Sequence, residues 1–395
     1  MPDSAEKKEA KSKKTAPQRL LELSRNADPS VQYAVASNIN APVQALEYLA
    51  GHGKFTILKA VAGNPNVTPT ILFSLARHKQ WTVCEAVAWS KLAPVNLLVS
   101  LAGHAHWRVR QALLRNVNCS PKLFETLSGD AEMRVRLHVA FSFVCPPAVL
   151  EALASDPDSD VRNAVAGNWN TPPATARALA GDPEAYVRGG AADNLSRLRD
   201  HKHLNTLARD PDAQVRVKIA KLMLWNSSLH DHLVTDADGT VRAAIADHTE
   251  LPDAAALTLA RDPSDEVRTI IALRDHLSTA VLEVLVNDPN PEVRRALAYA
   301  KVDDVPAWVL ERLANDADKG VRWQVAYHWR TPKDTLRQLE ADRSGALGGS
   351  LQLGAELELS LQQSMLSSDR GSCLKPKSFT QRFELRKTRA SDSTP

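Results

Sequence analysis

The chain has 395 residues, of which 44% are hydrophobic, 24% charged and only 5% aromatic, and its formal net charge is +3. This composition is that of a folded protein, so it excludes a collagen-like or wholly disordered chain. No run of 18 apolar residues predicts a membrane span. The lysine-rich first residues contain no apolar stretch typical of a secretory signal. Four cysteines are too few for a disulfide scaffold, which favours a cytoplasmic location.

The charge is unevenly distributed along the chain. Residues 1–19 carry six Lys/Arg against three acids, and residues 370–395 carry seven against two. The segment between them therefore has a net charge of about −5. We expect residues 1–19 to be a disordered basic tail. Residues 348–395 are polar and of low complexity, and we expect a second disordered basic tail there.

A repeat of 26 residues organises most of the chain between these tails. A β-branched residue, mostly followed by Arg, marks each repeat, and the spacing is 26 except at two places where it is 28. Self-similarity of this length is the signature of a solenoid. The twelve marking residues, called anchors below and numbered as repeats 1 to 12, are Val31, Ile57, Val83, Val109, Val135, Val161, Val187, Val215, Val241, Val267, Val293 and Val321.

Each repeat predicts two short helices. An Asp five residues before the anchor, commonly followed by Pro as in Asp156-Pro157, predicts a helix N-cap. The anchor and the residues four and five later are apolar, as in Val161, Val165 and Ala166, which is helical spacing. An Asn seven residues after the anchor, such as Asn168, suits a left-handed C-cap. A second Pro then predicts the start of another helix with a buried Leu-Ala pair.

Helices this short are unstable alone, so neighbouring repeats must bury one another's apolar faces. We therefore predict an all-α protein, an α-solenoid of about twelve 26-residue two-helix repeats that spans residues 20–347 as one elongated domain.

The pattern Asp-Pro-x-x-x-Val-Arg-x-x-Val-Ala-x-Asn-x-x-Thr-Pro resembles the bacterial leucine-rich repeat variant family and, more distantly, HEAT-like solenoids. The resemblance covers roughly residues 20–347 and implies a right-handed superhelix of α- and short 3-10-type helices. One member type carries a cysteine-rich iron–sulfur segment ahead of the repeats. Residues 1–83 contain no cysteine, so that cluster is not carried over and no cofactor is expected.

Arg and Asp recur once per repeat. A basic groove for nucleic-acid phosphates is one interpretation. An internal ladder, in which each Arg binds a neighbouring Asp or a loop carbonyl, is favoured because both residues recur together. The expected ladder residues are Arg110, Arg136, Arg162, Arg188, Arg216, Arg242, Arg268, Arg294, Arg322, Asp130, Asp156, Asp182, Asp210, Asp236, Asp262, Asp288 and Asp316.

Repeats 2 to 4 break this pattern, because they carry His where repeats 5 to 12 carry Asp. Three residues later a large apolar side chain follows, and residues three apart on a helix share a face. Stacking would align a histidine column beside an apolar stripe, which predicts a partner-binding patch if it is exposed and ordinary core if it is covered. The candidates are His52, Phe55, His78, Trp81, His104, Trp107 and, from repeat 5, Met133.

Two His-x-His pairs are weak candidates for a transition-metal site. His201 and His203 lie in a 28-residue repeat, and His230 and His232 lie in the next. They lack the usual closed ligand set, so no metal is expected. Cys119 and Cys145 occupy the same repeat position but lie too far apart for a disulfide, which predicts small buried residues.

No catalytic motif stands out, so we expect a non-enzymatic scaffold that binds a protein partner along one face of the solenoid. A nucleic-acid-binding or DNA-repair protein of HEAT type is the alternative, with the basic tails as possible contacts, but the acidic repeat body argues against it. A HEAT-repeat lyase is a third possibility, by analogy of fold alone.

Overall fold

The computed structural model describes residues 3–222, 227–299 and 305–341. Within these ranges every regular element is a helix. The chain divides into two compact units, Met1–Ala255 and Ala256–Pro395, here called the N-terminal and the C-terminal unit. Each unit is built from the same short helix pairs, which confirms the all-α solenoid. A single continuous array over residues 20–347 stays a prediction. Residues 342–395, with the expected C-terminal tail, lie outside the described residues.

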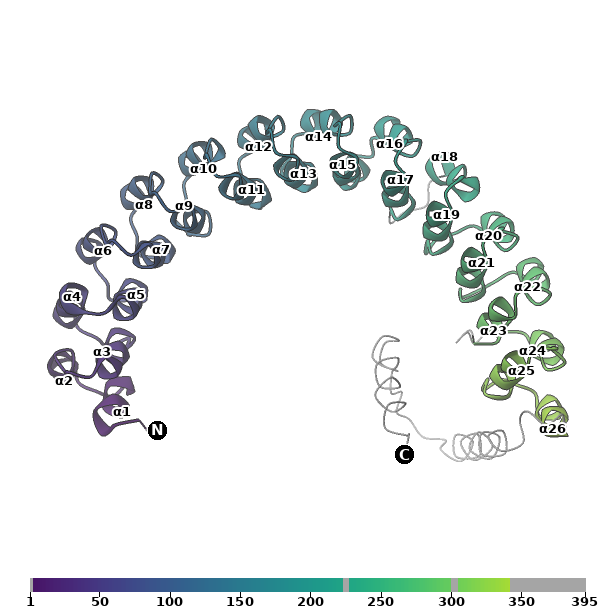
Figure 1. The fold of residues 1–395 in the computed structure, drawn as a ribbon, viewed down its shortest axis with the longest axis horizontal. Coiled ribbons are helices and arrows are strands. Elements are labelled where there is room, and N and C mark those ends of the chain that lie inside the picture. Colours follow the sequence, from purple (N-terminus) through teal and green to yellow (C-terminus); the bar gives the residue numbers. More distant parts are fainter. Residues whose placement is uncertain (1–2, 223–226, 300–304, 342–395) are drawn as a thin grey trace. The chain divides into compact units, whose positions relative to one another are not determined.

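Each repeat contributes one odd-numbered and one even-numbered element, and successive odd-numbered helices pack side by side within each unit. In the N-terminal unit the odd-numbered helices line the inner side of the curve (Figure 1). The odd row consists of α1 (Ala5–Lys11), α3 (Pro29–Ala36), α5 (Phe55–Gly63), α7 (Trp81–Trp89), α9 (Trp107–Leu113), α11 (Met133–Phe141), α13 (Ser159–Gly167), α15 (Ala185–Arg197), α17 (Ala213–Ala220), α19 (Gly239–Ala246), α21 (Asp265–Ala272), α23 (Pro291–Tyr299) and α25 (Lys319–Ala326).

Most helices of the even row begin at or next to a proline. The row consists of α2 (Pro17–Leu23), α4 (Val43–His52), α6 (Pro69–Leu75), α8 (Val95–Leu101), α10 (Pro121–Ser128), α12 (Pro147–Leu153), α14 (Pro173–Leu179), α16 (His201–Leu207), α18 (Ser227–His230) with the 3-10 turn η1 (Leu233–Thr235), α20 (Asp253–Leu259), α22 (Thr279–Leu285), α24 (Ala307–Leu313) and α26 (Lys333–Ala341).

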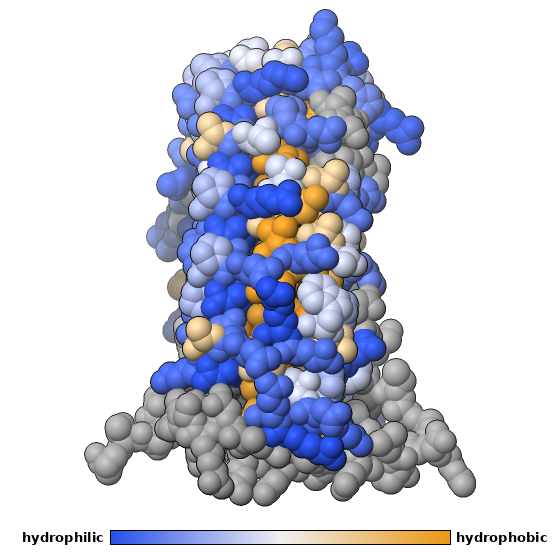
Figure 2. Space-filling model, turned by 90° about the vertical axis from the view of Figure 1, so that its right-hand side faces the viewer, coloured by the Kyte–Doolittle hydropathy of each residue, from blue (hydrophilic) through white to orange (hydrophobic). Residues whose placement is uncertain are grey.

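The core lies between the two rows. The anchors are buried, and in repeat 6 Val161, Val165 and Ala166 are all without solvent exposure. Leu150 and Leu153 of α12 are buried as well, as are the corresponding leucines of the other even-numbered helices. On the face shown in Figure 2, hydrophilic side chains flank a narrow apolar band, so little apolar surface is exposed there.

The predicted N-cap position is wrong by two residues. Helix α13 begins at Ser159, and its cap is Asp158, whose carboxylate accepts the amide of Asp160. Asp156 lies before the helix and accepts the amide of Asp158 at 2.9 Å. The Asp five residues before the anchor thus shapes the turn that precedes the helix, because Asp readily accepts an amide two residues on.

The asparagines seven residues after the anchor are not left-handed C-caps either. Asn168 has extended backbone, with φ of −77° and ψ of 130°. Its side-chain amide donates to the carbonyl oxygens of Ala140 at 2.6 Å and Ser142 at 3.0 Å in the preceding repeat. Asn64, Asn116 and Asn194 make the same pair of bonds one repeat back. These residues therefore tie successive repeats together.

The same asparagine contact extends the repeat array into residues 1–19, the segment expected to be a disordered tail. Asn38 of repeat 1 donates to the carbonyls of Ala10 and Ser12. Residues 5–23 form α1 and α2, and Ala10, Leu20 and Leu23 are buried. The prediction for residues 1–19 therefore differs from the structure over its described part. The many lysines of this segment suggested disorder, but α1 and α2 form a further helix pair in register with the repeats.

Candidate functional site

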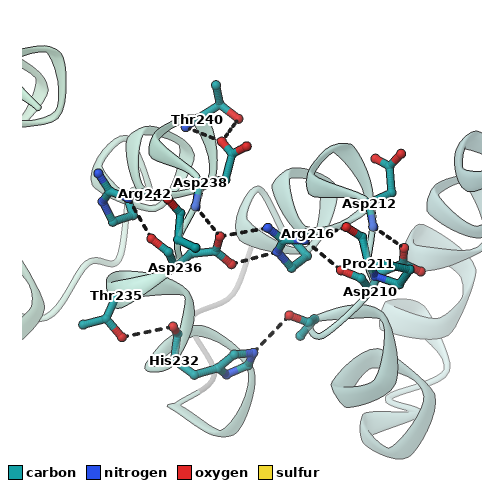
Figure 3. A network of polar contacts seen from close by, with 12 residues as sticks. Asp210, Pro211, Asp212, Arg216, His232, Thr235, Asp236, Asp238, Thr240 and Arg242 are labelled. Atoms are coloured by element: carbon teal, nitrogen blue, oxygen red, sulfur yellow. Dashed lines mark hydrogen bonds and ion pairs between the residues drawn. The ribbon is translucent and has the colours of Figure 1, made fainter.

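The ladder arginines and aspartates join successive repeats through two-pronged ion pairs. Arg162 donates from Nε and Nη2 to the carboxylate of Asp182, 20 residues later, at 2.7 and 3.0 Å. Its Nη1 donates to the carbonyl oxygen of Asp156. The same arrangement joins Arg216 to Asp236 and to the turn at Asp210 (Figure 3). The other pairs are Arg110–Asp130, Arg136–Asp156, Arg188–Asp210, Arg268–Asp288 and Arg294–Asp316.

Arg242 and Arg322 make the turn contact, donating from Nη1 to the carbonyl oxygens of Asp236 and Asp316. Asp262 accepts the amide of Ser264 and, through its carbonyl, a bond from Arg268. Every expected ladder residue thus makes an ion pair or a hydrogen bond at a turn between repeats. The arginines named here are engaged within the protein, so they supply no open phosphate groove.

The electrostatics of the ladder favour its charged form. Burial alone raises the pKa of Asp156, but hydrogen bonds from Arg136 and the Asp158 amide outweigh it and hold that pKa below its usual range. Asp182, Asp210, Asp236 and Asp316 behave alike. The hydrogen bond to Asp182 raises the pKa of Arg162. Both partners therefore stay ionised near neutral pH.

The ladder is missing between repeats 1 and 4, where both the Arg and its partner Asp are replaced. Gln32, Leu58 and Cys84 stand where later repeats have Arg. The residues 20 positions later, where Asp would be the partner, are His52, His78 and His104. A half-buried Asp without its Arg would be costly. The histidines therefore accompany the loss of the arginines, which explains their position without a ligand.

The three histidines do not form one column on a helix face. His78 and His104 precede α7 and α9, and their Nδ1 atoms accept the amides of Gln80 and His106, as Asp does elsewhere. Burial lowers the pKa of His104. His52 ends α4 instead and stacks on Tyr48, with ring centroids 4.5 Å apart. The expected shared face is absent because α5, α7 and α9 begin only at the aromatic residues.

The apolar residues of the prediction do come together. Phe55, Trp81, Trp107 and Met133 are the first residues of α5, α7, α9 and α11, which pack side by side; we call them the aromatic stripe. Phe55 is 51% exposed and the other three are half-buried.

Three residues that the sequence analysis did not single out complete the stripe. The ring of His106 stacks on Trp81 with centroids 4.0 Å apart. The guanidinium of Arg108 lies 5.4 Å from the ring centroids of both Trp81 and Trp107, and that of Arg134 lies 5.2 Å from Trp107. Both tryptophans are therefore partly covered by cations of the protein.

A second apolar surface lies at the opposite ends of the same helices, and the sequence analysis missed it. Phe143 is 81% exposed and Trp169 is 70% exposed. Such exposure of large apolar side chains in a group marks interaction sites. This surface, here called the loop edge, occupies the C-terminal ends of odd-numbered helices and the turns that follow them in repeats 3 to 6. Its residues are Trp89, Leu92, Val117, Phe141, Phe143, Val144 and Trp169.

The loop edge coincides with breaks in the asparagine pattern. In repeats 1, 2, 4 and 6 a second Asn, nine residues after the anchor, bonds to the preceding turn; Asn170 donates to the carbonyls of Phe143 and Cys145. Repeats 3 and 5 carry Leu92 and Val144 at this position. These substitutions are the sequence signal that could have identified the surface. Asn118 and Asn170 of the following repeats still hold the exposed turns in place.

A shallow cavity of about 330 Å³ adjoins the loop edge between α5 and α7. Gly63 lies at the repeat position that Trp89 holds in repeat 3, and no atom lies within 4 Å of where its side chain would be. This leaves one flank of the Trp89 ring open. The cavity is lined by Lys59, Gly63, Glu85, Ala86, Trp89 and Ser90.

The weak metal candidates are not assembled into a site. His203 bonds Asp200, His230 bonds the carbonyl of Ile219, and His232 bonds the carbonyl of Ala208. His201 lies at the start of α16. In the ranges that the structure describes, no three His, Cys, Asp or Glu side chains are grouped to hold a metal ion. Among the same residues, no helix is long and apolar enough to cross a bilayer.

The cysteines match the expectation of small residues packed in the protein. Cys145 is buried and Cys119 half-buried, and both are free thiols. Burial raises the pKa of Cys119 to about 11 and that of Cys145 to about 12.

Comparisons with known proteins give limited likeness. No family model matches the chain. No curated protein matches it either. A solved structure described as a leucine-rich repeat variant with a novel repetitive motif is 25% identical, covers 63% of this chain and 87% of its own, and has a TM-score of 0.41. An engineered protein is 16% identical over 78% of this chain and 92% of its own, with a TM-score of 0.10. At these TM-scores neither structure adds to what the repeats themselves establish, which is an all-α solenoid.

Proposed function

We propose that this protein is a non-enzymatic cytoplasmic scaffold that binds a protein partner along one face of the solenoid. The observation that carries the proposal is the loop edge, seven large apolar side chains exposed on consecutive turns of the N-terminal unit. The turns are fixed by hydrogen bonds from Asn118 and Asn170, so little ordering entropy would oppose binding. We further propose that its repeats are of the leucine-rich repeat variant type.

The aromatic stripe belongs to the same proposal as a second contact. It lies at the N-terminal ends of α5, α7, α9 and α11, and the loop edge begins at the C-terminal ends of α7 and α11. A helix of nine residues is about 13 Å long, so one extended partner segment can reach both surfaces. His52, His78 and His104 belong to the neighbouring turns, and Phe55 is the most exposed member of the stripe.

Affinity purification of the full chain tests this function. The wild type is compared with Phe143→Ser/Trp169→Ser, which alters the loop edge, and with Trp81→Ala/Trp107→Ala, which alters the stripe. Leu273→Ser/Tyr299→Ser removes exposed apolar side chains from the C-terminal unit and is the matched control. We expect a partner to be lost with the loop-edge variant and retained by the control. Identical partner sets from all four folded proteins would contradict the proposal.

A further inference from the structure

We propose that the partner of this surface is an acidic peptide segment, whose large apolar side chains lie on the loop edge while its carboxylates pair with the cations beside it. The inference rests on the proposed function, since it names the chemistry of the segment that would occupy the same surface. It follows from three observations: the charge of repeats 2 to 5, the exposure of the cations that carry this charge, and the arginines held over the tryptophans.

The charge of the N-terminal unit changes sign along the chain. Residues 52–155, which form repeats 2 to 5, contain eleven Lys/Arg against five Asp/Glu, a net charge of +6. Residues 156–255, which follow in the same unit, contain eleven Lys/Arg against fifteen Asp/Glu, a net charge of −4. The mildly acidic average of the repeat body conceals this division. The positive segment is the one that carries the aromatic stripe and most of the loop edge.

The cations of repeats 2 to 5 are also available. Arg110 and Arg136 belong to the ladder, but the other nine are exposed. Among the described residues, only Arg134 of these nine has a carboxylate within 4.0 Å, that of Glu132 at 3.8 Å. The nine exposed cations are Lys54, Lys59, Arg77, Lys79, Lys91, Arg108, Arg115, Lys122 and Arg134.

The break in the ladder leaves this excess nearly unchanged, because it removes charges of both signs. In repeats 5 to 9, each turn brings an Asp that neutralises the Arg of the preceding repeat. At the turns of repeats 2 to 4 the carboxylate is replaced by His52, His78 or His104. Three negative charges are thereby removed next to exposed lysines and arginines. The buried arginines are absent with them, so the substitution costs the fold little. The net positive charge comes instead from the nine exposed cations, which few acidic residues balance.

Three arginines are arranged to receive carboxylates. Arg108 and Arg134 lie over rings of the aromatic stripe, and Arg115 lies 5.7 Å from the ring centroid of Trp89 on the loop edge. Within the described residues, the guanidinium groups of Arg108 and Arg115 donate no hydrogen bond to the protein. A guanidinium has five N–H donors in a fork that matches a carboxylate, and a ring beneath it fixes its position.

The apolar side chains favour a peptide over a nucleic acid. Unpaired bases are bound by stacking on open aromatic faces. The ring of Trp81 is already stacked on His106. Leu92, Val117 and Val144 are aliphatic and have no ring for a base to stack on, but they suit the leucines or phenylalanines of a peptide. The cations would then pair with side-chain carboxylates between those anchors.

Fluorescence anisotropy with the full chain tests the inference. The probes are a labelled peptide of about 20 residues composed of Glu, Leu and Phe, the same peptide with Gln for Glu, the same with Lys for Glu, and an oligouridine of similar length. We expect the Glu peptide to bind about tenfold more tightly than the Gln peptide, and to weaken when NaCl rises from about 50 to about 300 mM. The Lys peptide should not bind.

Variants locate the effect. Arg108→Gln/Arg115→Gln/Arg134→Gln should lower the affinity for the Glu peptide about tenfold. The matched control, Lys202→Gln/Arg209→Gln/Lys221→Gln, removes three exposed cations from repeats 7 and 8 and should leave it unchanged. Thermal melting of both variants shows that they are folded.

The other outcomes each decide a point. Equal binding of the Glu and Gln peptides, abolished by Phe143→Ser/Trp169→Ser, would overturn the acidic partner and leave the proposed function standing. Tighter binding of the oligouridine than of any peptide, lost with the three arginines, would overturn both in favour of nucleic acid. No binding of the Glu peptide at about 100 μM, a concentration at which weak peptide contacts are still seen, would overturn the inference.

Discussion

Repeats 2 to 5 and repeats 6 to 9 share one helix pattern but treat charge in opposite ways. From repeat 5 onward nearly every turn holds an Asp that faces the Arg of the previous repeat, and the pairs are largely buried. In repeats 2 to 4 the Asp is absent, and the preceding Arg is absent with it. The later repeats therefore use charge for cohesion between neighbours, whereas the earlier ones leave cations exposed beside apolar side chains.

This difference shows that a solenoid can lose part of its charge ladder without losing its stacking. The anchors of repeats 2 to 5 are as buried as those of repeats 6 to 9. Stacking depends on these apolar contacts and on the asparagine bonds, and the ladder adds to them. Where the ladder is absent, the positions it would occupy are free to vary.

The largest expected effect comes from removing one half of a ladder pair. Asp182→Ala would leave Arg162, whose side chain is 13% exposed, without its carboxylate. We expect the free energy of unfolding to fall by about 3 kcal/mol, since an unpaired buried charge is costly. Urea unfolding followed by circular dichroism measures it.

The matched control uses the solution found in repeats 2 and 3. Arg162→Leu/Asp182→His copies the natural combination Leu58 and His78. It should recover most of the lost stability, because neither partner remains to be left unpaired. If the double variant were as unstable as Asp182→Ala, the joint loss of Arg and Asp would not explain how repeats 2 to 4 keep their stacking.

A smaller loss is expected from the asparagine bonds. Asn168→Ala removes two hydrogen bonds to the carbonyls of Ala140 and Ser142. We expect a loss of about 2 kcal/mol, at about 1 kcal/mol for each bond. Asn168→Ser copies the natural Ser142 and should lose less. Equal stability of the Ala variant and the wild type in urea unfolding would show that stacking does not need these bonds.

Acid should weaken the ladder, and repeats 2 to 4 contribute nothing to this effect. Although burial alone would raise it, the pKa of Asp182 is held below its usual range by hydrogen bonds from Arg162 and the Glu184 amide. Stability from a depressed pKa is fully present above the unfolded value and is lost as the pH falls through the folded one. The urea midpoint should therefore not change with pH near neutrality, where the ladder contributes its full stability, and should decrease when the pH is lowered below about 4.

Asp182→Asn is the control for this pH dependence. This variant should be less stable than the wild type at pH 7. It should lose less stability on acidification, because one ladder carboxylate no longer titrates. The two stability curves should approach each other toward pH 2. Parallel curves over the whole range would mean that Asp182 does not contribute to the acid transition.

The smallest effect concerns the turns beneath the loop edge. Cys119 and Cys145 have pKa values of about 11 and about 12, raised by burial. At pH 8 very little thiolate forms, so iodoacetamide should react slowly with both thiols in the folded protein and quickly in urea. Mass spectrometry of peptides follows the labelling. Rapid labelling of native Cys145 would indicate that the turn of repeat 5 opens, against the fixed surface described here.

Much of the architecture could be predicted from the sequence because it depends on period. The spacing of Val161, Val165 and Ala166 requires a helix, and its recurrence requires stacking. The details that failed depend on partners in other repeats. Asn168 was interpreted as a local cap because its sequence neighbours suit one, yet it bonds to a residue 28 positions earlier. Lysines on α1 masked Ala10 as a buried position.

The candidate surface was predicted only in part. Phe55, Trp81, Trp107 and Met133 stand out because they interrupt one repeat position, and the structure brings them together. Phe143 and Trp169 were missed because they lie in the turn, a position where the side chain varies freely from repeat to repeat. Whether a side chain in the turn is exposed depends on the backbone path of the turn, which the repeat length of the sequence does not specify.

The contact of Asn38 with α1 has a consequence for assembly. An open stack presents at its end the same apolar face that a further repeat would cover, so an unprotected end invites another molecule to continue the stack. Helix α1 occupies that place with Ala10 turned inward and lysines outward. Helix α1 thus covers the apolar side of α3 and accepts the side-chain amide of Asn38, so repeat 1 is packed against a neighbour in the same way as the repeats that follow it.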